Sequence, residues 1–427
     1  MEGLKVCVIG AGSTYTPELV EGFIVRKKEL PVARMSLMDI DGAKLKVVGS
    51  LAKRMVEKAK LTTKVELTTD RKRAIEGADF ILTQIRVGGI PARIRDERIP
   101  LDFGVIGQET TGPGGFAKAL RTIPAMLDIA RDVEKLAPNA WWINFTNPSG
   151  IIAETLLKHS RAKVIGLCNV PIGMTKSLAT KLGVKPEDLL LRYVGLNHLS
   201  WITAVSAGGK DLTKEAVRLS LKGRAKEDAA WMRAYGIIPN GYLHYYYARD
   251  AVFEAQKKAE KTRGEIVSEV ERDLLEKYRN PNLKRKPKEL EKRGGAHYST
   301  AAVSLASAIY NSKREIHIVN VRNAGTISCL PPDCAIETSC MIDGTGAHPL
   351  TIGEVPLEIR GLLQAVKSYE ELTVQAGVKG SKKLALQALT AHPLVPSFMV
   401  AKGLLDKILD ANAEYLPQFR RGRARTR

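Results

Sequence analysis

The sequence predicts an α/β fold in two domains, a doubly wound parallel sheet followed by a mixed α+β domain. Three observations lead to this prediction. At 427 residues the chain exceeds what one compact core usually holds. Its first half alternates strand-like and helix-like segments, as doubly wound domains do. Its opening apolar run, 4–9, ends directly on Gly10-Ala11-Gly12, which is typical of a first strand that turns into a helix in a Rossmann-type domain.

The glycine turn predicts a dinucleotide site. Gly10 permits the tight turn, and Gly12, followed by Ser13, lets the backbone approach a pyrophosphate at the helix N-terminus. The third glycine of the usual pattern is replaced by Tyr15. A second apolar run ends at Asp39, where a carboxylate would bind a ribose 2′-hydroxyl and repel a 2′-phosphate. The sequence therefore favours NAD over NADP, the alternative being an ordinary turn with a solvated Asp39.

The remaining elements of the first half follow in order. Apolar runs predict strands at 4–9, 34–39, 64–67, 79–85, 141–145 and 163–168. Helices are expected at 17–29, 43–59 and 115–135. Several strands lead into polar or small residues, and in open α/β sheets the ligand crevice lies outside the carboxyl ends of the strands. Segments after 85, 145 and 167 should therefore converge beside the glycine turn.

Domain boundaries are expected at residue 196 and near 418. Residues 1–196 form the predicted NAD-binding domain, and residues 197–418 form the α+β substrate domain, with strand-like stretches at 201–206, 315–321 and 335–342. Residues 419–427 are a basic tail that we expect to be disordered.

Composition is typical of a globular enzyme. Hydrophobic residues make up 44% and charged residues 26% of the chain, enough for a sizeable core. No apolar run reaches membrane-spanning length, and the first apolar stretch is interrupted by glycines, unlike a signal peptide. Five cysteines without framework spacing favour a reducing compartment. These features predict a cytoplasmic protein.

The net charge of +20 raises the question of nucleic acid binding. Much of the excess is local, in the stretch 279–288 and the tail 420–427, and neither is interleaved with aromatic residues that would stack on bases. A positive field also attracts a phosphorylated small molecule. We expect no nucleic acid and no membrane partner. The alternative, a nucleotide-dependent DNA binder, would lose salt-sensitive DNA retention when 420–427 are deleted.

A thiol and an imidazole form a candidate metal site. Cys168 follows the strand at 163–168, and His198 lies in Gly195-Leu-Asn-His. Two protein ligands would leave coordination positions open for substrate or water, as in catalytic metal sites. A Cys–His nucleophile dyad is the alternative, but it gives no reason for a dinucleotide domain.

Three further segments carry side chains suited to chemistry. The glycine-rich connector 107–115 carries one carboxylate, Glu109. The segment 240–247 is a cluster of tyrosines, of which one at most need be functional. Arg293, beside two glycines, offers a guanidinium suited to a phosphate group.

Taken together, these motifs resemble glycoside hydrolase family 4, the NAD- and divalent-metal-dependent glycosidases, and within it the members that act on 6-phospho-β-glucosides. The resemblance runs from residue 4 to about 410. It rests on the order of several motifs: the opening Gly-x-Gly-Ser, Arg-x-Gly-Gly, Asp-Glu-x-Ile-Pro, Gly-Gln-Glu-Thr, Asn-Phe-Thr-Asn-Pro-Ser-Gly, Gly-Leu-Cys-Asn-Val-Pro and Gly-Leu-Asn-His-Leu-Ser. It implies a homodimer or homotetramer and a nucleotide domain related to that of lactate and malate dehydrogenases.

The resemblance also implies a role for each matching residue. The implied metal ligands, usually of manganese, are Cys168 and His198. The implied catalytic base is Tyr242, with Tyr245, Tyr246 and Tyr247 close by, and Glu109 matches a carboxylate that influences its basicity. The implied substrate contacts are Arg93, Asn147, Asn169 and Arg293, with the arginines on the 6-phosphate. Members acting on α-linked substrates can carry Asp where this chain has Asn169, which favours the β-linked class.

The implied mechanism is redox elimination. NAD⁺ oxidises C3 of the sugar, the metal and the ketone acidify the C2 hydrogen, a phenolate removes it, and the C1 substituent leaves before water adds. The mechanism releases glucose 6-phosphate without net redox change and needs no pair of catalytic carboxylates. Two alternatives are an NAD-dependent 2-hydroxyacid dehydrogenase and a relative acting on α-linked 6-phosphoglucosides.

Overall fold

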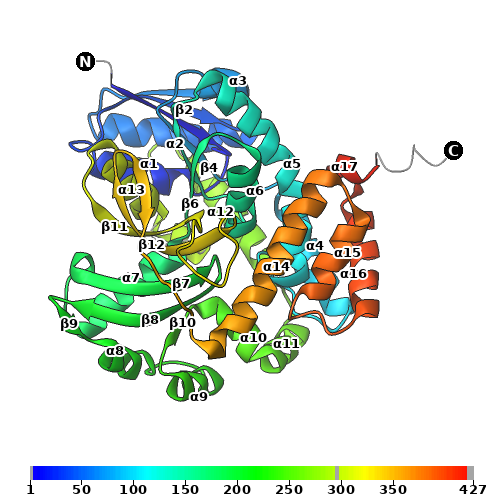
Figure 1. Cartoon of the computed structure of the whole chain (residues 1–427). Coiled ribbons are helices and arrows are strands. Elements are labelled where there is room, and N and C mark those ends of the chain that lie inside the picture. Colours follow the sequence, from blue (N-terminus) through cyan, green and yellow to red (C-terminus); the bar gives the residue numbers. More distant parts are fainter. Residues whose placement is uncertain (1–2, 294–297, 421–427) are drawn as a thin grey trace.

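The computed structural model describes residues 3–293 and 298–420, and a nine-stranded sheet forms its centre (Figure 1). Six of the strands are parallel and lie in the order β3-β2-β1-β4-β5-β6. Their bounds are β1 Leu4–Ile9, β2 Val32–Met38, β3 Lys64–Thr68, β4 Phe80–Thr83, β5 Trp141–Asn144 and β6 Lys163–Gly166. This is the strand order of a dinucleotide-binding sheet, with its ligand crevice where the order reverses, between β1 and β4. The predicted Rossmann-type domain is confirmed.

The predicted elements of the first half lie within a few residues of the observed ones. The helix expected at 17–29 is α1, Thr16–Val25, and it ends early because residues 26–29 form a turn. The strand expected at 79–85 is shorter because the chain leaves the sheet after Thr83. The helices expected at 43–59 and 115–135 are α2, Gly42–Lys58, and α5, Gly112–Leu136.

The helices around the sheet pack in two groups. One group contains α1 and α2 with α12, Arg263–Arg279, and α13, Tyr298–Tyr310. The other contains α5 with α3, Arg71–Ile75, α6, Ser149–His159, and α14, Leu357–Lys379. The last helices of the chain lie beside α5 and α14 (Figure 1); they are α15 Lys382–Ala391, α16 Phe398–Ala411 and α17 Pro417–Arg420. Of these, α16 also packs with α4, Gly89–Asp102.

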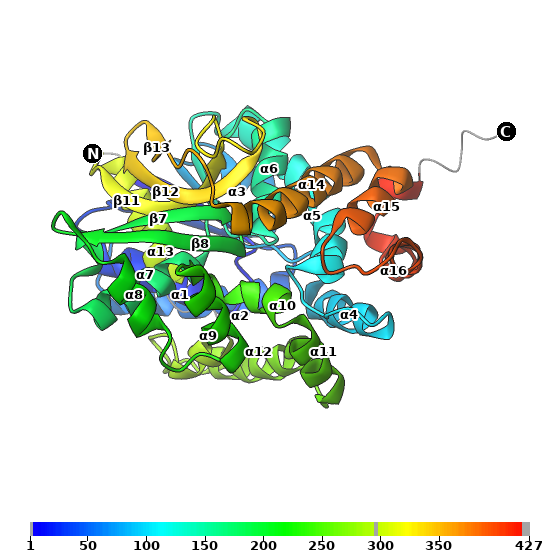
Figure 2. The ribbon, with the colours of Figure 1, turned by 60° about the horizontal axis from the view of Figure 1, so that its bottom comes forward.

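Strands of the second half continue the sheet of the first half. The strand β11, Glu315–Arg322, pairs antiparallel with β6, and β12, Ala335–Asp343, and β13, Gly346–Pro349, follow it outward. A smaller antiparallel sheet packs against β12 through β7 (Figure 2). It consists of β7 Leu189–Leu196, β8 Leu199–Ala207, β9 Lys210–Asp211 and β10 Ile238–Pro239.

The structure differs from the predicted domain division in two places. The boundary at residue 196 passes through the β7–β8 hairpin, and the strands of 315–349 belong to the sheet assigned to the first domain. The predicted tail began at residue 419, but residues 419 and 420 belong to α17. The rest of that tail, 421–427, lies outside the described residues.

The remaining helices follow β6 in the chain. They are α7 Asn169–Leu182, α8 Thr213–Ser220, α9 Lys226–Tyr235, α10 His244–Tyr247, α11 Arg249–Lys258 and the short 3₁₀ turns η1 Pro186–Asp188, η2 Gly241–Leu243, η3 Lys288–Arg293 and η4 Ala413–Tyr415. None of the helices in the described ranges combines the length and apolarity needed to cross a bilayer.

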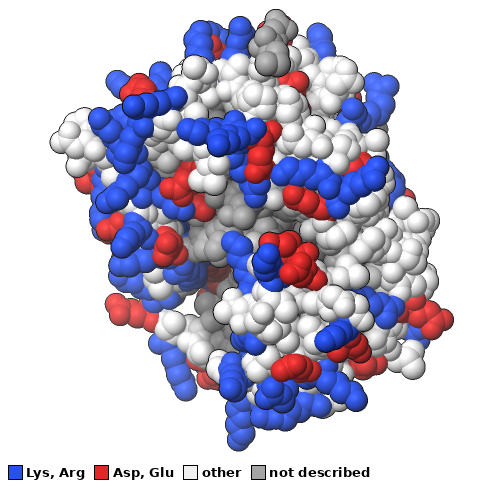
Figure 3. Space-filling model, turned by 90° about the vertical axis from the view of Figure 1, so that its left-hand side faces the viewer, with Lys and Arg blue, Asp and Glu red and all other residues white. Residues whose placement is uncertain are grey.

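Basic side chains cover much of the face shown in Figure 3, around a hollow, with acidic side chains among them. Part of the basic stretch 279–288 is held by ion pairs, since Lys286 Nζ lies 2.6 Å from carboxylate oxygens of both Glu18 and Glu21. This part of the stretch is therefore anchored to α1.

Candidate active site

The glycine turn lies at the carboxyl end of β1, at the reversal of strand order. Gly10 has φ +88°, and a Cβ there would lie 2.9 Å from the carbonyl carbon of Gln84. A Cβ on Gly12 would lie 2.8 Å from Asp39 Oδ2, the same atom that accepts from the Gly12 backbone N–H at 2.7 Å. Position 10 therefore requires glycine, whereas a Cβ at position 12 would displace the Asp39 carboxylate. Ser13 continues the turn, and its hydroxyl accepts from the Tyr15 N–H at 3.3 Å.

Cys168 and His198 meet as the sequence predicts. Cys168 caps the N-terminus of α7, and His198 lies in the β7–β8 turn with φ +65°. Their Sγ and Nε2 atoms are 3.5 Å apart, and each residue is 6% exposed. Burial, reinforced by Glu337, raises the pKa of the thiol to about 12, while burial and Lys118 lower the pKa of the imidazole to about 3.

The chemistry of this pair suits a divalent cation. A neutral imidazole presents a lone pair, and a cation would favour the thiolate that burial otherwise disfavours. Within the described part of the chain, no group of three or more His, Cys, Asp or Glu side chains could hold a metal ion. A two-ligand site, open to substrate oxygens, is therefore the arrangement that these residues fit.

Tyr242 packs directly on the metal-site histidine. The Tyr242 and His198 rings are stacked, with centroids 3.8 Å apart and planes 3° apart. Tyr242 lies in η2, where the Asn240 side chain accepts from its backbone N–H at 3.0 Å. Burial, then the proximity of Cys168 and Glu109, raises the pKa of the Tyr242 phenol. A base at this position would therefore need a cation beside it, which the adjacent metal site would supply.

The three neighbouring tyrosines have other partners. Tyr245 is tilted against Tyr242 at 5.8 Å. Tyr246 packs toward His392, with ring centroids 6.0 Å apart. The hydroxyl of Tyr247 accepts from the Trp201 indole N–H at 3.2 Å. Of the four, Tyr242 is the one stacked on His198.

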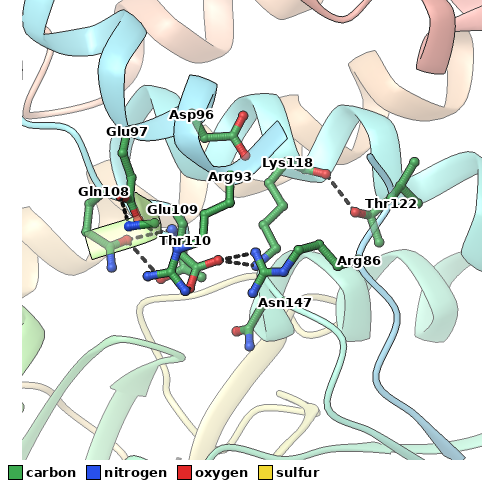
Figure 4. Close-up of polar contacts among 12 residues, drawn as sticks. Arg86, Arg93, Asp96, Glu97, Gln108, Glu109, Thr110, Lys118, Thr122 and Asn147 are labelled. Atoms are coloured by element: carbon green, nitrogen blue, oxygen red, sulfur yellow. Dashed lines mark hydrogen bonds and ion pairs between the residues drawn. The ribbon is translucent and has the colours of Figure 1, made fainter. Parts of the chain in front are cut away.

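Glu109 is surrounded by cations (Figure 4). Arg86 and Lys118 approach its Oε2, Lys118 at 2.9 Å, and Arg93 Nη1 lies 2.9 Å from Oε1. Burial opposes ionisation, but Arg86, Lys118 and Arg93 outweigh it and hold the pKa of Glu109 well below its usual range. Burial and the neighbouring Arg86 also lower the pKa of Lys118 to about 7. The cluster keeps a net positive charge close to the candidate metal site.

Replacing Glu109 with Gln is expected to destabilise the fold by about 3 kcal/mol, because three buried cations lose their shared counter-ion. The pKa of Glu109 lies below its usual value of 4.5, so its stabilisation is present above that pH and is lost as the pH falls through the lowered pKa. Urea unfolding at pH 7 and at pH 3.5 should therefore show a smaller difference between wild type and variant at the lower pH.

The matched control is Glu265→Gln, which breaks the more exposed pair with Arg98 and should cost less than about 1 kcal/mol. Equal losses in the two variants at pH 7 would contradict a special role for the Glu109 cluster.

The other predicted substrate residues lie around this space. Arg93, besides Glu109, contacts Glu97 through Nε at 2.8 Å. Asn147, beside Arg86 in Figure 4, precedes a cis proline, and its Oδ1 is buried without a partner among the described residues. Asn169 follows Cys168, and its Oδ1 lies 3.9 Å from the thiol sulfur.

Arg293 pairs with other residues than Glu109 and lies against Tyr15, which follows the glycine turn. Its guanidinium stacks over the Tyr15 ring at 4.2 Å, and its Nη2 donates to Glu271 at 2.9 Å. Within 3–293 and 298–420 its buried Nε and Nη1 have no hydrogen-bond partner. Tyr15, which replaces the third glycine, therefore supports a cation near the predicted dinucleotide site. The glycines after Arg293 lie outside the described residues.

Three charged residues of this region were not predicted as site residues from the sequence, namely Arg86, Lys118 and Glu337. Arg86 was noticed only as part of a motif. Lys118 could have been found as a lone cation in the apolar run Phe116-Ala-Lys-Ala-Leu, and Glu337 as a lone carboxylate in the strand Ala335-Ile-Glu-Thr-Ser. Both are almost fully buried, and such charges occur mainly where a partner or a function holds them.

A dinucleotide-type sheet, an open thiol–imidazole pair and a phenol stacked on that imidazole define a dehydrogenase-like α/β enzyme with a candidate metal site. The chain belongs to family 4 of the glycosyl hydrolases. The sequence model of the family, described as family 4 glycosyl hydrolase, matches residues 5–184. The sequence model of the family 4 glycosyl hydrolase C-terminal domain matches residues 193–395.

Relatives span nearly the whole chain. A probable 6-phospho-β-glucosidase of Bacillus subtilis (strain 168) is 47% identical over 98% of both chains. A 6-phospho-β-glucosidase of Escherichia coli (strain K12) is 41% identical over 97% of both. The structure of the 6-phospho-β-glucosidase from Thermotoga maritima with manganese, NAD⁺ and glucose 6-phosphate is 40% identical, covers 96% of this chain and 99% of that one, and has a TM-score of 0.91.

More distant comparisons separate fold from function. A phospho-α-glucosidase of Clostridium acetobutylicum is 32% identical over 97% of this chain and 99% of its own. Lactate dehydrogenase from Eimeria maxima is 14% identical and covers 89% of this chain and 97% of that one, with a TM-score of 0.52. The predicted likeness to lactate and malate dehydrogenases is thus confirmed as a likeness of fold.

Proposed function

We propose that this protein is a 6-phospho-β-glucosidase that uses NAD and a divalent metal ion, manganese in the first instance, and releases glucose 6-phosphate. The observation that carries the proposal is the stack of Tyr242 on His198, with the Cys168 sulfur 3.5 Å from the imidazole. It places a phenol next to an open pair of metal ligands. The groups bound in the Thermotoga maritima structure and the activities for which the relatives are named support the same assignment.

The residues present divide the work. When bound, NAD⁺ would supply reversible oxidation at C3 of the sugar, and a metal ion held by Cys168 and His198 would acidify the C2 hydrogen. Tyr242 would then accept the C2 proton as general base. The C1–O bond breaks after that proton is lost, and water adds at C1. Glu109 would hold Arg86, Arg93 and Lys118 in place, so that this positive region faces an anionic substrate.

Two observations favour the β-linked class. Asn169, next to the metal-site cysteine, has no acidic proton to give to a leaving group, whereas an Asp there could act as general acid. The relatives named for β-linked substrates are 47% and 41% identical to this chain, against 32% for the α-linked relative. We therefore place the α-linked activity second.

The proposal is tested with chromogenic 6-phosphoglucosides of both anomers, each with and without NAD⁺ and Mn²⁺. We expect cleavage of the β-anomer only when both NAD⁺ and Mn²⁺ are present, without net NADH. Steady NADH release from a 2-hydroxy acid would instead support the dehydrogenase alternative. Preferential cleavage of the α-anomer would move the protein to the other class.

Replacing Arg93 with Ala should weaken use of the phosphorylated substrate. A bidentate phosphate contact is worth about 2–3 kcal/mol, so kcat/KM should fall by a factor of about 30–150, while NAD⁺ affinity changes little. The same result is expected for Arg293→Ala if its unpartnered nitrogens bind phosphate. Steady-state kinetics and titration of NAD⁺ measure the two effects.

The matched control is Arg98→Ala, a more exposed arginine on the same helix that pairs with Glu265, and it should keep wild-type kinetics. If Arg93→Ala and Arg293→Ala also keep them, the phosphate is held elsewhere, and the basic stretch 284–288 becomes the next candidate.

A further inference from the structure

Glu337 is a fully buried carboxylate that the proposed chemistry leaves without a role. It lies on β12, in the middle of the strand. Its Oε1 accepts from the amides of Asn197 at 2.9 Å and Asn320 at 3.2 Å, and its Oε2 accepts from the Tyr193 hydroxyl at 3.1 Å. Among the described residues, Glu337 has three neutral donors and no ion pair with a cation. Burying a carboxylate in this way is costly, so its presence on β12 needs an explanation.

A chain of hydrogen bonds runs from Glu337 toward Tyr242. The Tyr193 hydroxyl, which donates to Glu337, accepts from Ser200 Oγ at 2.7 Å. Ser200 Oγ accepts in turn from Asn240 Nδ2 at 3.1 Å. The other end of that amide, Oδ1, accepts from the Tyr242 backbone N–H at 3.0 Å. All the members between the carboxylate and Tyr242 are buried.

The carboxylate determines the direction of every bond in this chain. Burial raises the pKa of Glu337 to about 7. In its ionised form the carboxylate only accepts, so Tyr193 donates to it and the Tyr193 oxygen is left to accept from Ser200. Ser200 then has its oxygen left to accept from the NH₂ group of Asn240. This fixes which way the Asn240 amide faces, with its oxygen toward the Tyr242 N–H. The orientation of the Asn240 amide, which caps η2, is thus set by Glu337 through a chain of hydrogen bonds.

A second branch from Glu337 reaches the metal-site turn. Asn197, which donates to Oε1, directly precedes His198, whose φ of +65° a non-glycine residue adopts only when its surroundings impose it. Asn197 also hydrogen-bonds toward the Cys168 thiol. One carboxylate therefore contacts the segment that carries His198 and, through Tyr193, the segment that carries Tyr242.

We propose that Glu337 is a positioning residue that holds the His198 turn and the Tyr242 turn in register, through Asn197 on one side and through Tyr193, Ser200 and Asn240 on the other. The proposal rests on the proposed function of His198 and Tyr242. It assigns Glu337 no contact with substrate or cofactor. Its effect is on the relative placement of the metal ligand and the phenol.

The test compares Glu337→Gln, which changes both branches, with Ser200→Ala, which weakens only the Tyr242 branch. Without the Ser200 hydroxyl, that branch keeps only the longer contact of 3.4 Å in which Asn240 Nδ2 donates to the Tyr193 hydroxyl. Gln must turn one donor toward a group that already donates, so the direction of one branch reverses. In Glu337→Gln we expect kcat to fall at least about tenfold and Mn²⁺ affinity, measured calorimetrically on the protein without substrate, to fall about tenfold. In Ser200→Ala we expect a similar fall in kcat with KM and Mn²⁺ affinity almost unchanged.

Ser339→Ala is the matched control, because Ser339 is an equally buried serine on β12 whose hydroxyl donates to the Leu191 carbonyl at 2.7 Å. It should change neither kcat nor Mn²⁺ affinity. The proposal is overturned if Ser200→Ala and Ser339→Ala lose the same activity, or if folded Glu337→Gln keeps wild-type kcat and Mn²⁺ affinity. If Glu337→Gln does not fold, the serine pair still decides the Tyr242 branch.

The outcomes for the proposed function are separate. Full turnover in Tyr242→Phe would overturn the role of that phenol, whereas the Mn²⁺ affinities would still test the Asn197 branch by themselves.

Discussion

Tyr242→Phe is expected to lower kcat by a factor of roughly 10²–10⁴, the usual contribution of a general base. Phenylalanine keeps the ring that stacks on His198 at 3.8 Å but has no oxygen to accept the C2 proton. Metal and NAD⁺ affinity should change little, because the backbone of η2 stays capped by Asn240. The loss should therefore appear in kcat rather than in binding.

Hydrolysis in D₂O tests the same role of Tyr242 through the fate of the C2 hydrogen. If the C2 hydrogen is removed before the C1–O bond breaks, the sugar phosphate released by the wild-type protein should carry deuterium at C2. Tyr242→Phe should suppress both this exchange and turnover. Nuclear magnetic resonance of the product at C2 provides the measurement.

The matched control for the phenol is Tyr247→Phe, which removes a hydroxyl that accepts from Trp201 and should retain turnover. Normal C2 exchange in Tyr242→Phe would mean that another tyrosine is the base. The next candidate is Tyr245, whose ring contacts that of Tyr242. Brisk hydrolysis by the wild type without any exchange would rule out the elimination mechanism itself.

Cys168→Ser is expected to abolish Mn²⁺ binding at micromolar concentrations and, with it, turnover. A serine hydroxyl stays protonated where a thiol can become the anionic ligand, so the site keeps only the imidazole of His198. The fold should persist, because the substitution is nearly isosteric at the N-cap of α7 and serine is favoured there. Calorimetric titration with Mn²⁺ and far-ultraviolet circular dichroism measure the two expectations.

Cys340→Ser is the matched control, since Cys340 is an equally buried free thiol on β12 whose sulfur lies 3.6 Å from the Thr338 carbonyl. It should bind Mn²⁺ like the wild type. Oxidation with peroxide should reproduce the loss seen in Cys168→Ser, because an oxidised sulfur no longer ligates as a thiolate. Full activity of Cys168→Ser in the presence of a chelator would show that the metal assignment is wrong.

The sequence by itself predicted the elements whose signal is local. Apolar runs of strand length predicted the six parallel strands, and Gly10-Ala-Gly12 predicted the edge of the sheet at which a ligand binds. Both predictions succeed because a strand and the turn after it depend on the residues of one short segment. The pairing of Cys168 with His198 was also predicted, from the suitability of a thiol and an imidazole as metal ligands and from the family resemblance. Asp39 lies beside Gly12 as expected, although its role toward a ribose stays a prediction.

Only the tertiary structure decided the rest, because those contacts join residues distant in sequence. It added β11–β13 to the first sheet. The alternation of apolar residues predicts a strand but does not say which strand it pairs with. The tertiary structure also stacked Tyr242 on His198, a residue 44 positions earlier, and it set Arg86, Arg93 and Lys118 around Glu109. Glu337 lies 140 residues from Asn197, and a lone carboxylate in an apolar strand shows its partners only when the strands are packed. Composition and spacing thus determined which chemical groups this protein has, and long-range packing determined which of them act on one another.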